Sequence, residues 1–304
     1  MNNSILAFNE KTILHTQLKT AMQAIKNTHS MSGIVGTGML LLGPSGVGKT
    51  RILESYTKSY LSQQNDLETK TLSRRPILSI RVPASPTPKA ILEKLLTAAG
   101  HPFPTSSTQS KLEIKLQAVI KNQHVSLIIL DEFQHMLKSQ AQKSTRSVLN
   151  FIKVLMDENK LAVVMAGTPE ALDSIQGFEE LYQRFTHEHI QLQPFSIDSP
   201  EETAKFSSYL MACEKILLDL GIHSMPMTSE TNLARIYLTS GGKLRLINRL
   251  IVKAIQSAAE KSNLTLMDFA LANTNPPLNP KLGTFNPFKA KPDAIAKRIK
   301  EVRL

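Results

Sequence analysis

One stretch of the sequence reads Gly43-Pro44-Ser45-Gly46-Val47-Gly48-Lys49-Thr50. It fits the phosphate-binding pattern G-x-x-x-x-G-K-[ST] at every fixed position, with an apolar run before it and an amphipathic run after it. The glycines let backbone N–H groups turn toward phosphate oxygens, and the helix that follows adds the partial positive charge of its N-terminus. We expect Lys49 to bridge the β- and γ-phosphates and the Thr50 hydroxyl to bind Mg²⁺. The stretch, extended by Arg51, is therefore predicted to bind ATP.

A second motif reads Leu127-Ile128-Ile129-Leu130-Asp131-Glu132. Its apolar residues predict a buried strand, and the two carboxylates leave that strand at its C-terminal end, where ligands of open α/β sheets bind. Asp131 is expected to complete the Mg²⁺ shell, and Glu132 to orient and deprotonate the attacking water. The two motifs together predict an ATP site whose metal ligands are Thr50 and Asp131.

Apolar runs of strand length alternate with amphipathic stretches of helix length, which is the pattern of parallel βαβ units. Runs this short and apolar are typical of strands buried on both faces. Strands are expected at Gly38–Leu42, Ile77–Val82, Ser126–Leu130, Ala162–Gly167 and His189–Leu192, and helices near Lys49–Gln63, Lys89–Ala99, Lys111–Lys121 and Arg146–Glu158. The predicted fold class is α/β, with a five-stranded parallel sheet as the core of a P-loop protein.

The pattern changes near residue 199. From Glu201 to Ala272 only helical periodicity appears, which predicts a small helical lid domain. After Asn273 the run Asn-Thr-Asn-Pro-Pro-Leu-Asn-Pro predicts an extended tail, with room for a short basic helix near Pro292–Val302. We therefore expect four parts: an N-terminal helical segment (1–37), a nucleotide-binding core (38–198), a helical lid (199–272) and a basic, Pro/Asn-rich C-terminal tail (273–304).

Composition indicates a soluble protein with polyanionic partners. The single cysteine, Cys213, fits a reducing compartment, and neither a signal peptide nor an apolar run long enough for a membrane is found, so we expect a cytoplasmic location and no membrane partner. Lys and Arg exceed Asp and Glu by 36 to 25, a net charge of +11, which favours DNA or RNA as a partner. A basic protein without such a partner remains the alternative.

At three further positions the sequence resembles the AAA+ superfamily, over roughly Leu14 to Ala272. The run ending in Thr168 resembles the family's first sensor, Leu181–Phe185 carries an Arg-Phe pair, and Gly241–Asn248 resembles the Gly-x-x-Arg second sensor. The resemblance implies that Thr168 and Arg245 sense the nucleotide. It also implies that Arg184 is an arginine finger acting on a neighbouring subunit's ATP, and hence that the chain forms an oligomer. An ordinary surface arginine is the alternative for both Arg184 and Arg245.

A narrower resemblance is to the TniB/TnsC family of transposition regulators, carried by Asp131–Met136, Ala166–Pro169 and Tyr182–Phe185. It implies a protein that binds ATP, assembles with itself into rings or helical filaments on double-stranded DNA, and links a TniQ-type target selector to the transposase. By the same resemblance Lys89 falls in a phosphate-contacting loop. Further candidate DNA contacts are Ser106, Ser107, Thr108, Lys111, Lys143 and Arg146. An aromatic content of only 5% argues against reading single-stranded bases by stacking.

Two phenylalanines, Phe285 and Phe288, stand in the otherwise polar tail. If the tail is extended they form a docking peptide for a partner, and otherwise they fold back on the chain's own core. The overall prediction is an ATP-dependent DNA-binding regulator of transposition. A non-hydrolysing ATP-dependent scaffold on DNA, a helicase or clamp-loader ATPase and a signalling switch NTPase remain as alternatives.

Overall fold

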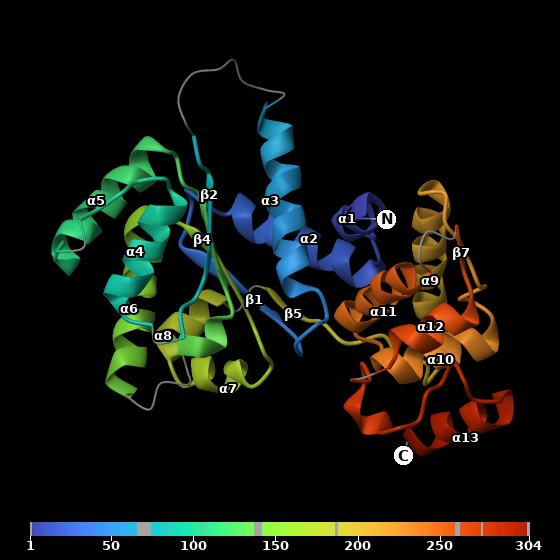
Figure 1. The fold of residues 1–304 in the computed structure, drawn as a ribbon. Coiled ribbons are helices and arrows are strands. Elements are labelled where there is room, and N and C mark those ends of the chain that lie inside the picture. Colours follow the sequence, from blue (N-terminus) through green and yellow to red (C-terminus); the bar gives the residue numbers. More distant parts are fainter. Residues whose placement is uncertain are drawn as a thin grey trace. The chain divides into compact units, whose positions relative to one another are not determined.

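The computed structural model describes residues 2–65, 74–84, 86–104, 106–136, 142–185, 188–258, 262–274 and 276–302 (Figure 1). The fold divides the chain into two compact units. The sheet unit comprises Gln17–Ser45 and Lys49–Leu192, and the helical unit comprises Met1–Thr16, Gly46–Gly48 and Gln193–Leu304. The expected N-terminal segment is thus shared, with α1 (Asn2–Glu10) in the helical unit and nearly all of α2 (Thr16–Ser30) in the sheet unit.

Five parallel strands form the sheet of the sheet unit. They are β1 (Thr37–Leu42), β2 (Ile77–Arg81), β3 (Leu127–Asp131), β4 (Ala162–Gly167) and β5 (Glu188–Gln191), in the order β2-β3-β4-β1-β5. Every residue of the three central strands is buried, whereas the two edge strands alternate in exposure. This confirms the predicted sheet, because only strands covered on both faces can be apolar throughout.

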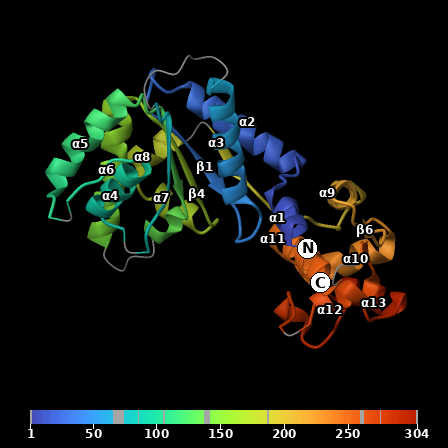
Figure 2. The same cartoon turned by 45° about the horizontal axis from the view of Figure 1, so that its top comes forward.

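Helices cover both faces of the sheet (Figures 1 and 2). On one face lie α4 (Pro88–Ala98), α5 (Gln109–Asn122) and α6 (Gln142–Asn159), whose leucines and isoleucines pack on Leu40, Ile128 and Val163. On the other lie α2 and α3 (Lys49–Asn65). The remaining short helices are η1 (Phe133–Met136), α7 (Ala171–Gln176), α8 (Glu179–Tyr182) and η2 (Gln183–Phe185).

A buried histidine ties three of these elements together. His29 of α2 lies 2.8 Å through Nδ1 from the Tyr56 hydroxyl of α3, and 2.7 Å through Nε2 from the Ser126 hydroxyl just before β3. The Tyr60 ring packs on it at 4.6 Å between centroids. Burial lowers the pKa of His29 to about 4, so the ring is neutral at physiological pH and bonds as both donor and acceptor.

The helical unit contains α9 (Pro200–Asp219), α10 (Glu230–Ser240), α11 (Leu244–Ser257) and α12 (Leu266–Ala272) besides α1. Its core repeats at helical spacing, as in Ile247, Leu250, Ile251 and Ala254 of α11. The expectation of helices alone is wrong, since β6 (His223–Ser224) and β7 (Asn263–Leu264) form a parallel two-stranded sheet. Two residues per strand are too few to show a period in the sequence.

The C-terminal segment is folded, and the predicted extended tail is wrong. It forms η3 (Pro280–Leu282) and α13 (Pro292–Val302), and α13 packs against α10. Phe288 is buried and stacks on Phe269 at 5.5 Å, while Phe285 is half-buried beside Leu282 and Ile295. Apolar side chains spaced along the segment complete the core of the helical unit, so Phe288 is not an exposed docking residue. Across the described residues, no helix has both the length and the apolar character needed to cross a membrane.

Candidate active site

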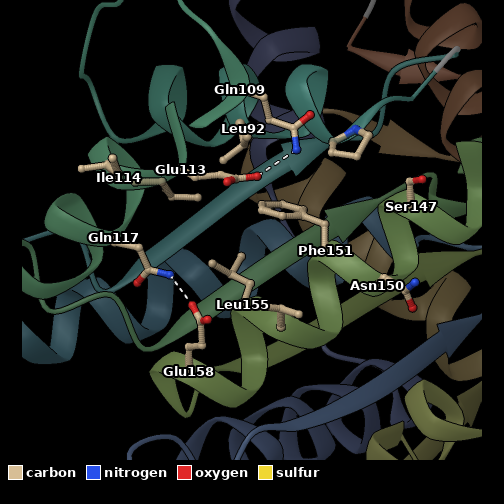
Figure 3. A pocket seen from close by; sticks show the side chains of 13 residues that line it. Leu92, Gln109, Glu113, Ile114, Gln117, Ser147, Asn150, Phe151, Leu155 and Glu158 are labelled. Atoms are coloured by element: carbon tan, nitrogen blue, oxygen red, sulfur yellow. Dashed lines mark hydrogen bonds between the residues drawn. The ribbon is translucent and has the colours of Figure 1, made fainter. Parts of the chain in front are cut away.

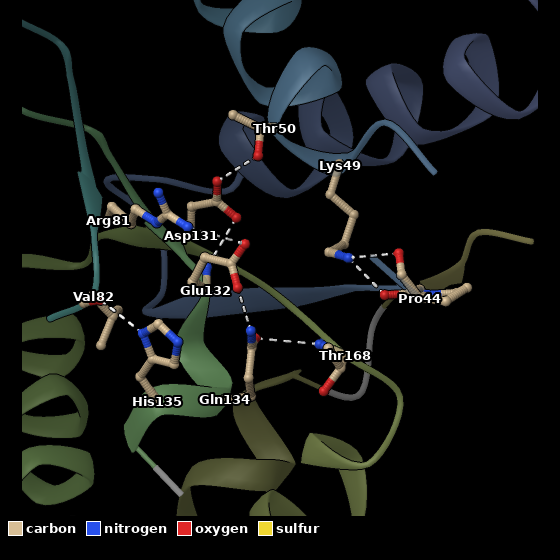
Figure 4. Close-up of polar contacts among 11 residues, drawn as sticks. Pro44, Lys49, Thr50, Arg81, Val82, Asp131, Glu132, Gln134, His135 and Thr168 are labelled. Carbon is tan, nitrogen blue, oxygen red and sulfur yellow. Dashed lines mark hydrogen bonds and ion pairs between the residues drawn. The ribbon is translucent and has the colours of Figure 1, made fainter. Parts of the chain in front are cut away.

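The predicted phosphate-binding stretch, Gly43–Thr50, lies between β1 and α3 and includes the start of α3 (Figure 4). Gly46 and Gly48 have φ values of 90° and 100°, which side-chain-bearing residues rarely adopt. Lys49 is buried, and its ammonium donates to the backbone oxygens of Gly43 (2.6 Å) and Pro44 (3.1 Å). The loop therefore holds a cation on its inner side, and the carbonyls that hold it can give way to phosphate oxygens.

Thr50 and Asp131 lie together at the C-terminal edge of the sheet. The Thr50 hydroxyl donates to Asp131 Oδ2 at 2.7 Å, and Asp131 Oδ1 accepts from the Glu132 N–H at 2.9 Å. A hydroxyl and a carboxylate side by side are hard oxygen ligands of the kind Mg²⁺ takes. Within the described ranges no group of three or more His, Cys, Asp or Glu side chains gathers as a metal site. The hydroxyl of Thr50 and the carboxylate of Asp131 are by themselves a donor set that fits Mg²⁺.

Glu132 is held in a strained position. Its φ is 59°, in the left-handed region that non-glycine residues seldom occupy, and such strain gathers at functional sites. Oε2 of its carboxylate accepts a hydrogen bond from the Gln134 side-chain amide, and Oε1 lies 3.7 Å from Arg81 Nη2. Both carboxylate oxygens are therefore engaged, one by an amide and one by a cation (Figure 4).

Gln134 links Glu132 to the end of β4. It is 6% exposed, and its Oε1 accepts from the backbone N–H of Thr168 at 3.3 Å. That bond fixes which end of the amide faces Glu132. The neighbouring Gly167 has no room for a Cβ, which would lie 2.6 Å from the Phe133 ring and 2.8 Å from Gln134 Oε1. Thr168 is thus placed beside the site by its backbone, through Gln134.

Sequence reasoning missed Gln134 and Arg81 as site residues. Gln134 stands in a stretch with a family resemblance, and its position two residues after Glu132 was the available signal. Arg81 ends β2, and the register pairs it with Asp131 on β3. A charged residue at the end of a strand next to β3 was a detectable signal once the strand order was known. The nearby His135 contacts the Val82 carbonyl oxygen at 3.2 Å and lies outside this network.

Arg184 is engaged within its own chain. Its Nε and Nη2 donate to Asp157 Oδ1 and Oδ2, both at 2.7 Å, and Nη1 donates to the Glu180 carbonyl oxygen. The next residue, Phe185, is fully buried, and a Cβ on Gly38 of β1 would overlap its ring. Phe185 therefore anchors the segment that carries Arg184 on the strand that leads into the phosphate loop.

Arg245 is exposed in the first turn of α11. Within the helical unit its backbone N–H donates to the Gly46 oxygen at 2.9 Å, and a Cβ on Gly46 would lie 3.3 Å from the Arg245 Cβ. The segment expected to carry the second sensor thus contacts Gly46, a residue of the same unit, through the backbone of Arg245. Its guanidinium remains a predicted sensor.

The candidate DNA contacts lie at the starts of three helices. Lys89 is in the first turn of α4, 3.9 Å from Glu93, and Thr108 caps α5 by accepting from the Lys111 N–H at 3.4 Å. Ser106, Lys111 and Arg146 are exposed and Ser107 is half-buried, while Lys143 lies in α6 with its side chain outside the described residues. The hydroxyl of Thr108, one of the predicted contacts, already accepts the hydrogen bond that caps α5.

A groove of about 540 Å³ runs between α5 and α6 (Figure 3). Pro88 and Gln109, at the starts of α4 and α5, and Ser147, in the second turn of α6, are among its lining residues. Farther along, Gln117 donates to Glu158 at 2.9 Å, and Gln109 donates to Glu113 at 2.8 Å. Two carboxylates, Glu113 and Glu158, are on its walls and disfavour phosphate inside the groove.

Comparisons with known proteins agree with this fold. The family model described as Bacterial TniB protein matches residues 6–195. Three solved structures are similar: Aeropyrum pernix ORC2 in its ADP form (TM-score 0.61, 15% identity, 88% of this chain and 71% of that chain), Aeropyrum pernix ORC1 in complex with DNA (0.63, 15%, 86% and 65%) and Cdc6p from Pyrobaculum aerophilum (0.59, 13%, 88% and 69%). At these identities the likeness shows the fold alone, and it confirms the α/β P-loop core followed by a helical lid. No curated protein matches the sequence.

Proposed function

The chain belongs to the TniB family, and on that premise we propose that it is an ATP-dependent, DNA-binding regulator of DNA transposition. In this proposal it oligomerises on double-stranded DNA and links a TniQ-type target selector to the transposase. The observation that carries the proposal is the contact of Thr50 with Asp131 at 2.7 Å, with Glu132 next in the chain. A phosphate loop, a magnesium pair and a carboxylate base in one place are the parts that ATP hydrolysis needs.

Each part has a defined task. Lys49 binds the β- and γ-phosphates when it leaves the carbonyls of Gly43 and Pro44. Thr50 and Asp131 hold Mg²⁺, which when bound neutralises phosphate charge. Glu132 orients a water molecule and accepts its proton. Arg184 supplies charge to a neighbouring subunit's phosphate, and to do so it must exchange Asp157 for that phosphate.

One observation favours slow hydrolysis, and with it the second candidate, a scaffold that ATP assembles on DNA. Gln134 engages Oε2 of Glu132, and the remaining oxygen, Oε1, lies 3.7 Å from Arg81 Nη2. An attacking water molecule must therefore compete with Arg81 for Oε1. We therefore propose that hydrolysis is slow until a partner or DNA changes the surroundings of Arg81.

The proposed DNA surface consists of cations at helix starts. Lys89, Lys111 and Arg146 are basic residues in or near the first turns of α4, α5 and α6, where the helix dipoles add partial positive charge. Such contacts read phosphate and not bases, so binding is expected to be weakly sequence-selective and strongly salt-dependent.

Electron microscopy of the full chain with duplex DNA, with and without ATP and Mg²⁺, tests the proposal directly. Wild type should form rings or filaments on DNA only with ATP. Lys49→Ala should not bind ATP and should not assemble on DNA. Glu132→Gln should bind ATP and remain assembled on DNA. If Lys49→Ala binds radiolabelled ATP like wild type in a filter assay, the site assignment is wrong. If wild type binds ATP but never assembles on DNA, the site stands and the regulator proposal is wrong.

A further inference from the structure

The folded C-terminal segment of the helical unit carries a basic surface. Between residues 276 and 302 six basic residues face two acidic ones, so 6 − 2 gives a net charge of +4. Five lysines of this segment are exposed: Lys281, Lys289, Lys291, Lys297 and Lys300. We call these five lysines together with Arg298 the tail surface. Its charge is held on a folded scaffold and not on a free chain.

Specific contacts pin this scaffold in place. Arg235 of α10 is 8% exposed, and its Nε and Nη2 donate to the backbone oxygens of Pro287 and Ala290, both at 3.1 Å. The Asn286 side chain donates to the Ala270 oxygen at 2.8 Å. With Phe288 buried against Phe269, the backbone that carries Lys289 and Lys291 is fixed. A fixed array of cations binds a polyanion at a lower entropic cost than a flexible one does.

Three residues of the tail surface line a hollow of roughly 630 Å³. Lys289, Lys297, Arg298, Phe285 and Glu301 are among its lining residues. The Arg298 guanidinium lies over the Phe285 ring at 5.8 Å, and its Nη1 donates to Glu301 Oε2 at 2.7 Å. Three cations and one carboxylate are thus among the lining residues of the hollow, which favours an anionic ligand there.

We propose that the tail surface binds the phosphate backbone of double-stranded DNA without nucleotide, as a DNA contact separate from the helix starts of the sheet unit. This inference rests on DNA being the partner in the proposed function. An acidic protein is the other polyanion to consider. Protein interfaces are poor in lysine and are built around buried apolar anchors. Among the described residues 276–302 no large apolar side chain is exposed.

Single-stranded bases fit this surface less well than a duplex. Within the described residues 276–302, Phe285 is the only aromatic residue that is not fully buried, and Arg298 lies over its ring. Base stacking needs a free ring face. Lysine ammonium groups, in contrast, suit phosphate as point charges and carry no sequence preference.

The test is a comparison of two double variants of the full chain. Lys289→Gln with Lys297→Gln removes two charges beside the hollow, and Lys11→Gln with Lys215→Gln removes two exposed charges elsewhere in the same unit. Binding of a fluorescent duplex of arbitrary sequence is measured by anisotropy without nucleotide, from about 50 to 200 mM salt. The first variant should flatten the log–log salt slope by about 0.9 for each phosphate that it no longer neutralises, and the second should leave it near wild type. Lys289→Arg with Lys297→Arg, which keeps both charges, should keep the slope.

Three results would overturn the proposal. Equal losses of affinity in both double variants would show that only net charge matters. An unchanged slope in the first variant would show that these lysines bind no phosphate. Competition by poly-glutamate as effective as that by duplex DNA would point to acidic proteins. ATP-dependent assembly on DNA is measured separately for wild type and the variants. If wild type does not assemble, the proposed function is contradicted, whereas the tail-surface proposal is judged by the salt slopes alone.

Discussion

Arg184 and Asp157 form a two-pronged ion pair, with Nε–Oδ1 and Nη2–Oδ2 both at 2.7 Å. The pair is partly exposed, at 26% and 42% of the two side chains, so its contribution to stability is modest, about 0.5–1 kcal/mol. An arginine paired in this way can stabilise its own subunit, or it can supply positive charge to the ATP site of a neighbouring subunit. The two roles separate when each partner is removed in turn.

Removing Arg184 should impair the assembly and not the subunit. Arg184→Ala is expected to spare ATP binding by an isolated subunit and to lower ATPase activity in the assembly by more than about tenfold, because it removes the positive charge that stabilises the transferred phosphate. Asp157→Ala breaks the same ion pair and frees Arg184, so its activity should be maintained or raised. Mixing Arg184→Ala with Lys49→Ala should restore part of the activity. If Arg184→Ala and Asp157→Ala lower the activity equally, Arg184 stabilises its own subunit through the ion pair and does not act on a neighbouring subunit's ATP.

Gln134 should control the rate of hydrolysis and not the binding of ATP. Gln134→Ala leaves the Glu132 carboxylate without its positioning amide, and we expect kcat to fall about tenfold at unchanged affinity for a fluorescent ATP analogue. His135→Ala, on the same short helix but outside the network, is the control. Arg81→Met should raise the basal rate, because Glu132 Oε1 is then free to accept a hydrogen bond from the attacking water. If Gln134→Ala loses affinity for ATP, Gln134 maintains the structure of the ATP site and is not specifically a positioning residue for Glu132.

The helix starts of the sheet unit should account for ATP-dependent DNA binding. Lys89→Ala or Arg146→Ala is expected to flatten the log–log salt slope by about 0.9 and to weaken all duplex sequences alike. Lys121→Ala, an exposed lysine in the last turn of α5, should change neither. Titrations of labelled duplex in the presence of ATP give both quantities. Unchanged slopes for Lys89 and Arg146 would place the DNA surface elsewhere.

The buried His29 should make the sheet unit acid-sensitive. Its pKa is lowered to about 4 in the folded chain from 6.5 in the unfolded one, so the unfolded state binds more protons between these values. Stability is therefore full above pH 6.5 and is lost as pH falls toward 4, by at most about 3 kcal/mol. His29→Gln should flatten this dependence in urea melts at pH 7, 6 and 5. The same dependence in the variant and wild type would contradict the assignment.

The two phenylalanines of the C-terminal segment should differ in their effect on stability. Phe288→Ala empties a fully packed site and is expected to cost about 3–5 kcal/mol, whereas Phe285→Ala, at a half-buried site, should cost clearly less. Thermal melts of the two variants make the comparison. Similar melting temperatures for Phe288→Ala and wild type would return Phe288 to the role of an exposed docking residue.

Local patterns predicted the sheet and the phosphate loop because each depends on residues close in the chain. Glu132 could be named from its strand alone, whereas Arg81 required the register of β2 against β3. The pairing of Arg184 with Asp157 joins residues whose contact only the tertiary fold creates. These partners could not be read from spacing.

The C-terminal segment was misjudged for a related reason. Asparagines and prolines predict a loop, and the chain does turn there. However, Asn279 donates to the Leu238 oxygen and Asn273 accepts from the Leu278 N–H, so the polar residues hold the segment against the helices. Composition shows where regular structure ends. It does not show whether the irregular backbone finds partners.

The contact of Phe185 with Gly38 has a geometric consequence for any array of these subunits. The Phe185 ring packs closely on Gly38 of β1, the strand that leads into the predicted phosphate loop. This packing holds Arg184 at a fixed position relative to that strand. In a head-to-tail array, Arg184 would contact the nucleotide of the neighbouring subunit, while the phosphate loop at the end of β1 would bind the nucleotide of its own subunit. The rise and rotation between successive ATP sites would then be set by the packing inside one subunit.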